Sequence, residues 1–283
     1  MLTYCNGVWH PNYNFGNDLA LGRAQGVQEF LEARGKILFH WDDHYARLVS
    51  SCSTRRSIVL NRLPSKEEIE KQSSRLLEKF GTITSLVRIL VTPGDSHDTK
   101  TASGYPTLSL DIMTWPTLPE KALKLKTVQA RREFPQSKFT AGYGYADIYE
   151  AEVRDQGFDK FLYWDERGGI LEGAYENIFL ITKEGLLVTP RNGVLLGITR
   201  KIVLELARAS KLFDGKVTES PAMHLGAPTA FKEAFLTSTT LGVAEVVQID
   251  DYDHFKTGPK TLTFKLKKLF IKHREKYFKE RGA

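Results

Sequence analysis

Apolar positions in the first 115 residues follow two spacings, one typical of strands and the other of helices. Strands are predicted for LTYCNGVW (2–9), ARGKILFHW (33–41), SLVRILVTPG (85–94) and YPTLSLDIMTW (105–115). Helices are predicted for WDDHYARLVSSC (41–52) and PSKEEIEKQSSRLLEKFG (64–81). The second helix has a capping box at Ser65 and Glu68, and Gly81 marks its end.

A proline-containing segment, WPTLPEKA (115–122), is the predicted linker between two domains. Beyond it, strands are predicted for LKLKTVQA (123–130), FDKFLYW (158–164), ENIFLIT (176–182), GLLVTP (185–190), EAFLTSTT (233–240) and AEVVQID (244–250). Helices are predicted for YGYADIYEAEVRDQG (143–157), TRKIVLELARAS (199–210) and the tail from residue 264. This irregular order predicts an α+β protein, with a small N-terminal α/β domain (1–114), the linker (115–122) and a larger C-terminal domain (123–283).

Composition narrows the class of protein. The chain has 283 residues, 41% of them hydrophobic, which is enough to bury a sizeable core. No apolar run approaches the ~18 residues that span a membrane. The N-terminus also lacks the basic start and apolar core of a signal peptide, so we expect a cytoplasmic protein. The two cysteines, Cys5 and Cys52, are too few for a disulfide framework or a cysteine-ligated metal site, and no metal is predicted.

The net charge of +6 raises the question of a polyanionic partner. The basic excess is concentrated in the tail, FKLKKLFIKHREKYFKERGA (264–283), where apolar residues recur at helical spacing. This pattern predicts an amphipathic helix docked on a core with its lysines solvated. The sequence has no zinc-finger spacing or RNP-type aromatic motif, so neither a nucleic-acid nor a membrane partner is expected.

Glu172 is the first candidate for chemistry, because GGILEGAYENIFLI (168–181) places it beside an apolar strand. A buried carboxylate must be paired or hydrogen-bonded, and the alternative is a strand-end glutamate turned toward solvent. Lys138 lies in a loop before a helix, where an ordinary surface lysine is the alternative. Arg47 lies on a helix, where a solvated arginine is the alternative.

Two further segments place polar groups at a helix start or after a strand. Gly197-Ile198-Thr199 opens a helix, where backbone N–H groups, the Thr199 hydroxyl and the helix dipole suit an anion. A simple threonine N-cap is the alternative. FLTSTTLG (235–242) offers four hydroxyls after a strand, and its alternative is a polar turn.

In order and spacing, these segments resemble the class IV (fold-type IV) pyridoxal-phosphate-dependent aminotransferases. That group includes branched-chain aminotransferases, D-amino-acid aminotransferases and aminodeoxychorismate lyases. The resemblance covers nearly the whole chain, from GVQEFLEARGKILFHWDDHYARL to EAFLTSTTLGVAEVV. Its central motifs are the Lys–x4–Tyr of KFTAGYGY, the E–x4–N–x–F of ILEGAYENIF and the GITR of LLGITR. It implies two domains of the D-amino-acid aminotransferase-like fold, pyridoxal 5'-phosphate as cofactor, and a homodimer. The active site would lie between the domains, partly closed by the neighbouring subunit.

The resemblance also assigns roles to residues around the cofactor ring. Lys138 would be the catalytic residue and would form the Schiff base with the cofactor. Tyr143 would hydrogen-bond the phenolic oxygen, Glu172 would contact the pyridine nitrogen, and Leu195 would pack against the ring. A carboxylate beside the ring nitrogen favours the protonated ring, which is the form that accepts electrons.

Other matched residues would bind the phosphate and the substrate. Arg47, Ile198, Thr199 and Thr239 would hold the phosphate, and this set supplies the positive charge and oriented N–H donors that a phosphate needs. Thr240 matches the position whose backbone N–H meets the substrate α-carboxylate.

In this resemblance, four more residues bear on the choice of substrate. Arg88, in LVRILVTPGD, aligns with an arginine of branched-chain enzymes and would receive the side-chain carboxylate of glutamate, with a strand-edge salt bridge as the alternative. Gln28 in GVQEF and Tyr175 in EGAYEN stand where relatives carry an aromatic and a small residue, and both would line the substrate pocket. Pro93 replaces the arginine of the D-amino-acid enzymes' VTRG, which weakens the D-specific interpretation.

The leading hypothesis is a transaminase that moves an amino group between a branched-chain-like L-amino acid or glutamate and a 2-oxo acid. Within the same fold, the alternatives are a lyase of the aminodeoxychorismate type, which releases pyruvate, and a D-amino-acid aminotransferase. A non-catalytic binding protein is the alternative of a different class, and it predicts no covalently bound cofactor.

Overall fold

The computed structural model describes residues 1–12, 14–118, 121–167, 169–224 and 230–282. The chain divides into two compact units: unit 1 comprises Met1–Pro116, Ser137–Tyr143 and Lys276–Ala283, and unit 2 comprises Thr117–Gln136 and Gly144–Glu275. The first division lies inside the segment 115–122. Residues 137–143 and 276–283 lie within the predicted second domain but are grouped with unit 1. Within the described part of the chain, no helix is both long and apolar enough to cross a membrane.

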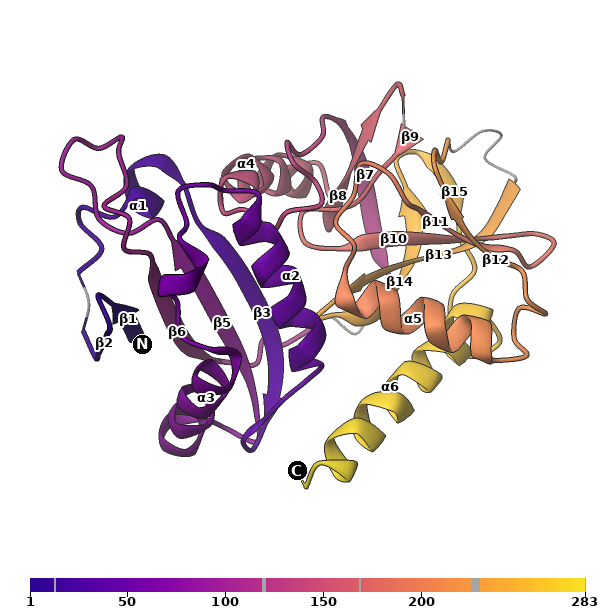
Figure 1. Cartoon of the computed structure of the whole chain (residues 1–283). Coiled ribbons are helices and arrows are strands. Elements are labelled where there is room, and N and C mark those ends of the chain that lie inside the picture. Colours follow the sequence, from indigo (N-terminus) through magenta and orange to yellow (C-terminus); the bar gives the residue numbers. More distant parts are fainter. Residues whose placement is uncertain (13, 119–120, 168, 225–229, 283) are drawn as a thin grey trace. The chain divides into compact units, whose positions relative to one another are not determined.

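Unit 1 is built on an antiparallel six-stranded sheet of order β2-β1-β6-β5-β3-β4 (Figure 1). Its strands are β1 (Leu2–Cys5), β2 (Val8–His10), β3 (Val27–Arg34), β4 (Ile37–Leu38), β5 (Thr84–Thr92) and β6 (Thr107–Thr114). The first predicted strand is a hairpin, because Asn6 and Gly7 both have positive φ, 50° and 83°, as a tight two-residue turn requires. β3 begins at Val27, earlier than predicted, and a turn at Gly35-Lys36 separates it from β4.

Two helices, α2 (Trp41–Ser53) and α3 (Lys66–Phe80), bury their apolar faces in the core of this sheet. The core side chains come from alternate strand positions and from helix positions three and four apart: Val27, Leu31, Val87, Ile89, Val91, Leu108, Leu110, Leu48, Cys52, Ile69, Leu76 and Leu77. The Ser65 hydroxyl caps α3 by accepting from the Glu68 N–H at 3.2 Å. The Glu68 carboxylate accepts from Gln72 at 2.7 Å. Neither α1 (Leu19–Arg23) nor the 3₁₀ turn η1 (Leu60–Arg62) was predicted.

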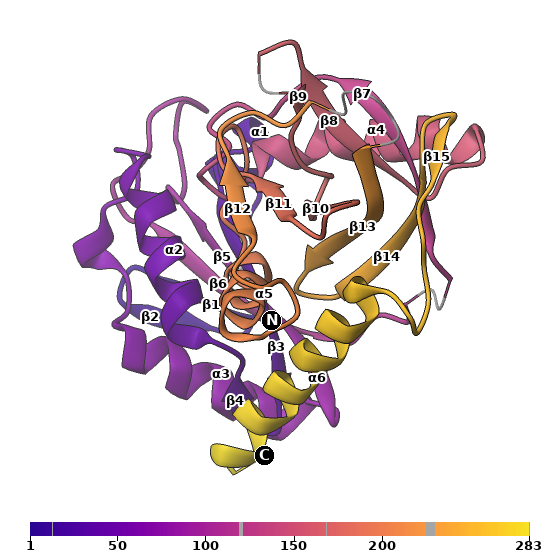
Figure 2. The ribbon, with the colours of Figure 1, turned by 90° about the vertical axis from the view of Figure 1, so that its right-hand side faces the viewer.

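Unit 2 is built on a mixed nine-stranded sheet of order β12-β11-β10-β13-β14-β7-β8-β9, with β15 paired to β14 (Figures 1 and 2). Its strands are β7 (Leu123–Gln129), β8 (Lys160–Asp165), β9 (Gly169–Ile170), β10 (Asn177–Thr182), β11 (Leu187–Pro190), β12 (Val217–Ser220), β13 (Phe231–Ser238), β14 (Gly242–Ile249) and β15 (Tyr252–His254). The pairs β7–β8, β7–β14 and β11–β12 are parallel, and the others are antiparallel. The fold class is therefore α+β, as predicted.

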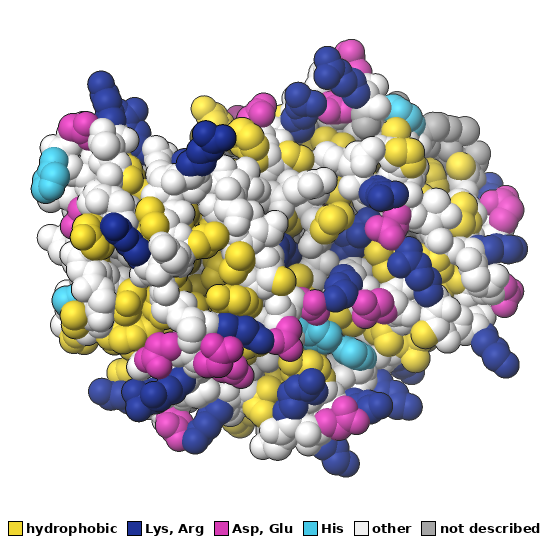
Figure 3. All heavy atoms as spheres, in the orientation of Figure 1, with side chains coloured by type: hydrophobic (Ala, Val, Ile, Leu, Met, Phe, Trp, Pro, Cys, Tyr) yellow, Lys and Arg dark blue, Asp and Glu magenta, His cyan; other side chains and the backbone are white. Residues whose placement is uncertain are grey.

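Three helices accompany this sheet: α4 (Ala141–Asp155), α5 (Ile198–Ala209) and α6 (Leu262–Glu280). α5 packs against β12 and β13. Leu266 and Phe270 of α6 are buried, whereas Lys268 and Lys272 are exposed, so the tail is the amphipathic helix that its spacing predicts. On the face shown in Figure 3, basic side chains are interspersed with acidic ones.

The end of α6 is part of unit 1. It packs against the strand pair β3–β4 and against Phe39, which follows β4. The Phe278 ring stacks on Phe39 with centroids 5.4 Å apart, and the Arg34 guanidinium lies 4.7 Å from the Phe278 centroid. The Tyr277 hydroxyl donates to the Leu38 carbonyl at 3.4 Å. These contacts explain why residues 276–283 belong to unit 1.

Candidate active site

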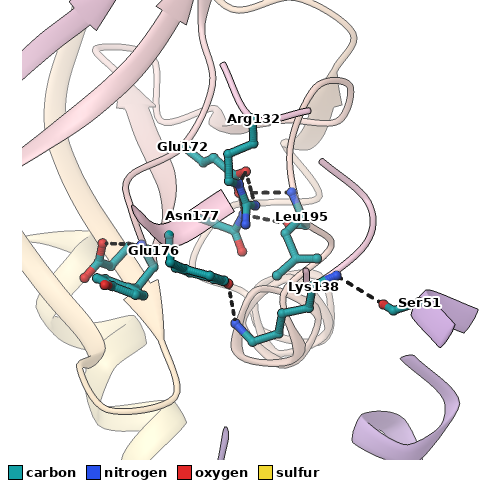
Figure 4. A network of polar contacts seen from close by, with 9 residues as sticks. Ser51, Arg132, Lys138, Glu172, Glu176, Asn177 and Leu195 are labelled. Atoms are coloured by element: carbon teal, nitrogen blue, oxygen red, sulfur yellow. Dashed lines mark hydrogen bonds and ion pairs between the residues drawn. The ribbon is translucent and has the colours of Figure 1, made fainter. Parts of the chain in front are cut away.

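Lys138 lies on a short segment that pairs with β3. The Gln28 N–H donates to the Lys138 carbonyl at 3.0 Å, and Phe139 forms a bridge with Val27. On the other side, the Lys138 N–H donates to the Ser51 hydroxyl of α2 at 3.1 Å (Figure 4). The backbone of Lys138 is therefore held by both the sheet and the helix of unit 1.

The side chain of Lys138 is buried and points its amine at a phenol. Lys138 Nζ donates to Tyr143 Oη at 2.9 Å, and the two residues are 9% and 8% exposed. Tyr143 lies in the first turn of α4, so the start of this helix places its hydroxyl beside the amine. The surface-lysine alternative for Lys138 does not describe this residue.

Arg47 of α2 is bound to a fully buried carboxylate. Its Nε and Nη2 donate to the two oxygens of Glu29 at 2.8 and 2.7 Å, and His44 Nδ1 donates to the same carboxylate at 2.8 Å. Burial raises the pKa of Glu29, but the charge and hydrogen bonds of Arg47, with those of His44, outweigh it and lower the pKa to about 2. Burial lowers the pKa of His44, and Glu29 only partly offsets this. Glu29 is therefore a charged anchor that fixes Arg47.

The cluster of Glu29, Arg47 and His44 predicts that the folded protein loses stability in acid. A fall in the pKa of Glu29 from 4.5 to about 2 contributes about 3 kcal/mol of stability. This contribution is complete above pH 4.5 and is lost as the pH falls toward 2. His44 acts in the same direction, because its stabilising effect is complete above pH 6.5 and declines below it.

We therefore expect Glu29→Gln to be less stable at pH 7 by about 3 kcal/mol, with a flatter stability profile between pH 4.5 and 2. Denaturant unfolding across this pH range measures both effects. Glu78→Gln, which alters a half-exposed surface pair with Lys36, is the control and should follow the wild-type profile. An unchanged slope in Glu29→Gln would contradict the prediction.

Glu172 is buried in unit 2, at the start of a tight turn. Its carbonyl accepts from the Tyr163 N–H of β8 at 2.8 Å, Glu172 and Asn177 form a bridge, and Gly173 N–H donates to the Glu176 carbonyl at 2.8 Å. The side chain is 3% exposed. The solvent-turned alternative is therefore wrong for this glutamate.

Three residues from separate segments donate hydrogen bonds to the Glu172 carboxylate (Figure 4). Arg132 donates to Oε1 through Nε at 3.0 Å and also through Nη2. Oε2 accepts from the Leu195 N–H at 2.9 Å and from Asn177 Nδ2 at 3.3 Å. Arg132 is not among the predicted site residues, because it lies 40 residues before Glu172 in a charged segment that looks like a surface loop.

The same asparagine lies against the start of α5. Asn177 Nδ2 also donates to the Leu195 carbonyl at 2.8 Å. Gly197 caps α5 without a side-chain hydrogen bond, and Ile198 and Thr199 form the first turn. The first N–H groups of a helix have no acceptor within the helix, so this turn offers donors to an anion. Thr199 is not the N-cap residue, which excludes that alternative.

Gly197 is required by this packing. A Cβ at Gly197 would lie 2.3 Å from Asn177 Oδ1, although its φ of −63° suits any residue. We expect Gly197→Ala to lose about 1–3 kcal/mol of stability, because Asn177 must move. Gly144→Ala, in α4 with nothing within 4 Å of its Cβ, should gain up to about 1 kcal/mol. Thermal unfolding of both variants measures the difference, and equal stabilities would refute the steric argument.

Thr239 and Thr240 lie in the turn between β13 and β14 of unit 2. Asn177 pairs with Thr237 in the register of β10 and β13, so this turn follows directly from the strand beside Asn177. Both threonines are partly buried. The hydroxyl-bearing turn and the Glu172 turn are therefore attached to neighbouring strands.

The predicted substrate residues have partners of their own. In unit 1, Gln28 lies opposite Leu90 and Arg88 opposite Phe30, so Gln28 and Arg88 share one face of the sheet. Arg88 forms an ion pair with Asp111 of β6, with Nη2 to Oδ2 at 2.8 Å. In unit 2, Tyr175 is 44% exposed, and its hydroxyl donates to Asp147 of α4 at 2.7 Å.

The predicted residues thus form one set in each unit. Unit 1 contains Gln28, Arg47, Arg88, Lys138 and Tyr143, among which Lys138 contacts both Gln28 and Tyr143. Unit 2 contains Glu172, Tyr175, Leu195, Ile198, Thr199, Thr239 and Thr240, and here Glu172 contacts Leu195.

Each unit is thus built on one sheet, with the buried lysine–tyrosine pair in unit 1 and the buried, donor-bound carboxylate in unit 2. The family model described as Amino-transferase class IV matches residues 26–249. The chain therefore belongs to the class IV aminotransferases, a family of pyridoxal-phosphate-dependent enzymes.

Individual relatives extend the comparison over most of the chain. A branched-chain-amino-acid aminotransferase from Pseudomonas aeruginosa is 27% identical over 254 residues, or 84% of this chain and 78% of that protein. The Escherichia coli branched-chain amino acid aminotransferase has a similar fold, with a TM-score of 0.81 at 21% identity, covering 96% of this chain and 93% of that one. Another branched-chain amino acid aminotransferase, solved in complex with N-(5'-phosphopyridoxyl)-L-glutamate, has a TM-score of 0.80 at 21% identity, with coverage of 96% and 93%.

Proposed function

We propose that the protein is a transaminase that moves an amino group between a branched-chain-like L-amino acid or glutamate and a 2-oxo acid, with Lys138 as its Schiff-base lysine. The observation that carries this proposal is the buried amine of Lys138, hydrogen-bonded at 2.9 Å to the Tyr143 phenol. A lysine amine is strongly hydrated, so its burial beside a polar partner suits a reactive group better than a structural one.

The residues of the chain fit the cofactor. Glu172 offers a buried carboxylate that donors already hold, and α5 begins with backbone N–H groups that no side chain caps. When bound, pyridoxal phosphate supplies an electron sink for the bonds at the substrate Cα. Glu172 would keep the ring nitrogen protonated, and Lys138 would carry the proton to and from the substrate Cα.

Different residues would bind the phosphate and the ring of the cofactor. Arg47, Ile198, Thr199 and Thr239 would hold the phosphate through a guanidinium, N–H groups and hydroxyls. The fixed position of Arg47 on Glu29 supports this role, because an anchored guanidinium loses little freedom on binding. Leu195 would pack against the ring, Tyr143 would bind its phenolic oxygen, and the Thr240 N–H would bind the substrate α-carboxylate.

The substrate class rests on two observations. The relatives reported above are named branched-chain aminotransferases, and one of them is complexed with a phosphopyridoxyl derivative of L-glutamate. Arg88 is our candidate for the glutamate side-chain carboxylate, and Asp111 then holds its guanidinium in place. Gln28 and Tyr175 would shape the remaining pocket, with Tyr175 anchored to Asp147.

A half-reaction panel tests the proposal. The purified yellow protein is mixed separately with L-leucine, L-glutamate, their D-isomers and aminodeoxychorismate, and the absorbance of the cofactor is recorded. We expect the L-amino acids to convert the cofactor to its amine form, and 2-oxo acids to reverse the change. Pyruvate release from aminodeoxychorismate without any amino-acid half-reaction would establish the lyase instead. A colourless protein that takes up no cofactor would establish the non-catalytic alternative.

The proposal includes a homodimer, which the resemblance implies, and a cytoplasmic location. Light scattering after size exclusion is expected to give twice the 32.1 kDa of one chain. A mass of one chain would rule out the dimer and leave the transaminase proposal to the half-reaction panel.

A further inference from the structure

Arg132 has no role in the function proposed above, yet it is buried and points inward. It follows β7, is 8% exposed, and gives two N–H groups to Oε1 of Glu172. Its neighbour Arg131 is exposed and lies 3.6 Å from Asp165 through Nη1. Two consecutive arginines therefore differ in burial and in the carboxylate they contact.

The two carboxylate oxygens of Glu172 accept hydrogen bonds from different residues. Arg132 binds Oε1, whereas the Leu195 N–H and Asn177 bind Oε2 (Figure 4). A glutamate side chain has several rotatable bonds, and contacts from three segments of unit 2 restrict them together. The carboxylate is thus oriented by the protein itself, which is the condition for electrostatic stabilisation without reorganisation.

The positive charge of Arg132 has a second effect on Glu172. A guanidinium stays protonated at every working pH, and a carboxylate beside it is favoured in its ionised form. A buried carboxyl group without such a partner tends to take up a proton, and a neutral carboxyl cannot stabilise a positive charge. Arg132 is therefore suited to keep Glu172 negative.

We propose that Arg132 is a positioning residue for amino transfer, which holds Glu172 ionised and oriented for the ring nitrogen of the cofactor. This inference rests on the proposed function. Arg132 acts through Glu172 and has no assigned contact with substrate or cofactor.

The test uses the full-length protein loaded with ¹⁵N-labelled pyridoxal phosphate. In Arg132→Met, we expect the half-reaction with an L-amino acid to slow about 10²-fold, because a small misplacement of a reacting group has this effect. The ¹⁵N signal of the ring nitrogen should move toward the unprotonated position, and the cofactor should bind more weakly. Arg131→Met is the matched control and should keep the wild-type rate, signal and affinity.

A double variant distinguishes positioning from a merely structural role. If Arg132 acts through Glu172, Arg132→Met should cause no further loss of rate in the Glu172→Gln background. The double variant should also be more stable than Arg132→Met alone, because it no longer leaves a buried carboxylate unpaired. A structural role predicts instead that the two losses of rate multiply and that the ¹⁵N signal of Arg132→Met stays at the wild-type position.

The outcomes separate this inference from the proposed function. A wild-type rate in Glu172→Gln overturns the role of Glu172 and this inference with it. A slow Glu172→Gln beside an Arg132→Met with wild-type rate and ¹⁵N signal overturns the positioning role alone. If Arg132→Met does not fold, Arg132→Lys decides: it keeps the charge and loses the fork of donors, and a wild-type rate and signal there also overturn the inference.

Discussion

Replacing Lys138 by alanine is expected to slow amino transfer about 10⁴-fold, the upper range for loss of a positioned acid–base group. The buried amine beside Tyr143 would be both the attachment point of the cofactor and the carrier of the substrate proton, so no other group replaces it. Single-turnover absorbance with L-glutamate and with L-leucine measures the rate. Borohydride reduction followed by peptide mass analysis locates the cofactor in the wild-type protein.

The control for this variant is Lys272→Ala, which removes an exposed lysine of α6 and should leave the rate and the label unchanged. The expected label is on Lys138 in the wild-type protein and absent from Lys138→Ala. A label on another lysine, or an alanine variant with wild-type turnover, would overturn the assignment of the reactive amine.

Replacing Glu172 by glutamine has the second large effect. We expect the half-reaction to slow about 10²–10³-fold, comparable to the loss of one preorganised electrostatic group. The cofactor should still bind, because Lys138 and the proposed phosphate residues are unchanged. The free energy of unfolding should also fall by about 3–5 kcal/mol, because Arg132 then loses its buried counter-charge.

Glu176→Gln separates these two effects. Glu176 lies in the same turn, is 4% exposed, and forms a 2.8 Å ion pair with Lys160. Its replacement should lower stability in a similar way and leave the half-reaction close to the wild-type rate. If both glutamine variants slow the reaction equally, the rate of Glu172→Gln reports general destabilisation, and the ring-nitrogen assignment is wrong. Denaturant unfolding and stopped-flow absorbance give the two measurements.

The sequence was sufficient to predict site residues where a residue and its hydrogen-bond partner lie in one short segment. The resemblance assigned both Lys138 and Tyr143 to the cofactor, and a helix that begins three residues after the lysine brings the two groups to 2.9 Å. Likewise, the apolar neighbours of Glu172 indicated that a buried carboxylate would need donors. The turn that closes at Asn177 supplies one of these donors from the motif itself.

Partners that are distant in the sequence were not predictable. Arg132 looks like part of a solvated charged segment, and no periodicity connects it to a strand that begins 45 residues later. Arg47 was expected as a phosphate ligand, but its bond to Glu29 depends on the face of β3 that α2 covers. Burial on a specific face is a property of the assembled unit, so single-sequence patterns do not reveal it.

Very short elements were missed for a different reason. β9 has two residues, α1 has five and β15 has three, which is too short for either spacing of apolar positions to repeat. The hairpin of β1 and β2 was read as one strand because Asn6-Gly7 was not recognised as a turn. Turn chemistry decides such boundaries more than hydrophobicity does.

The grouping of residues 137–143 and 276–283 with unit 1 has a consequence for the order of folding. Lys138 pairs with Gln28, and Phe278 packs on Phe39, so unit 1 closes only after long loops have formed. Such loops carry an entropic cost and slow the search for the native pairing. In refolding experiments, helix signals should therefore recover before the amine of Lys138 is in place, and cofactor capture should mark the last phase.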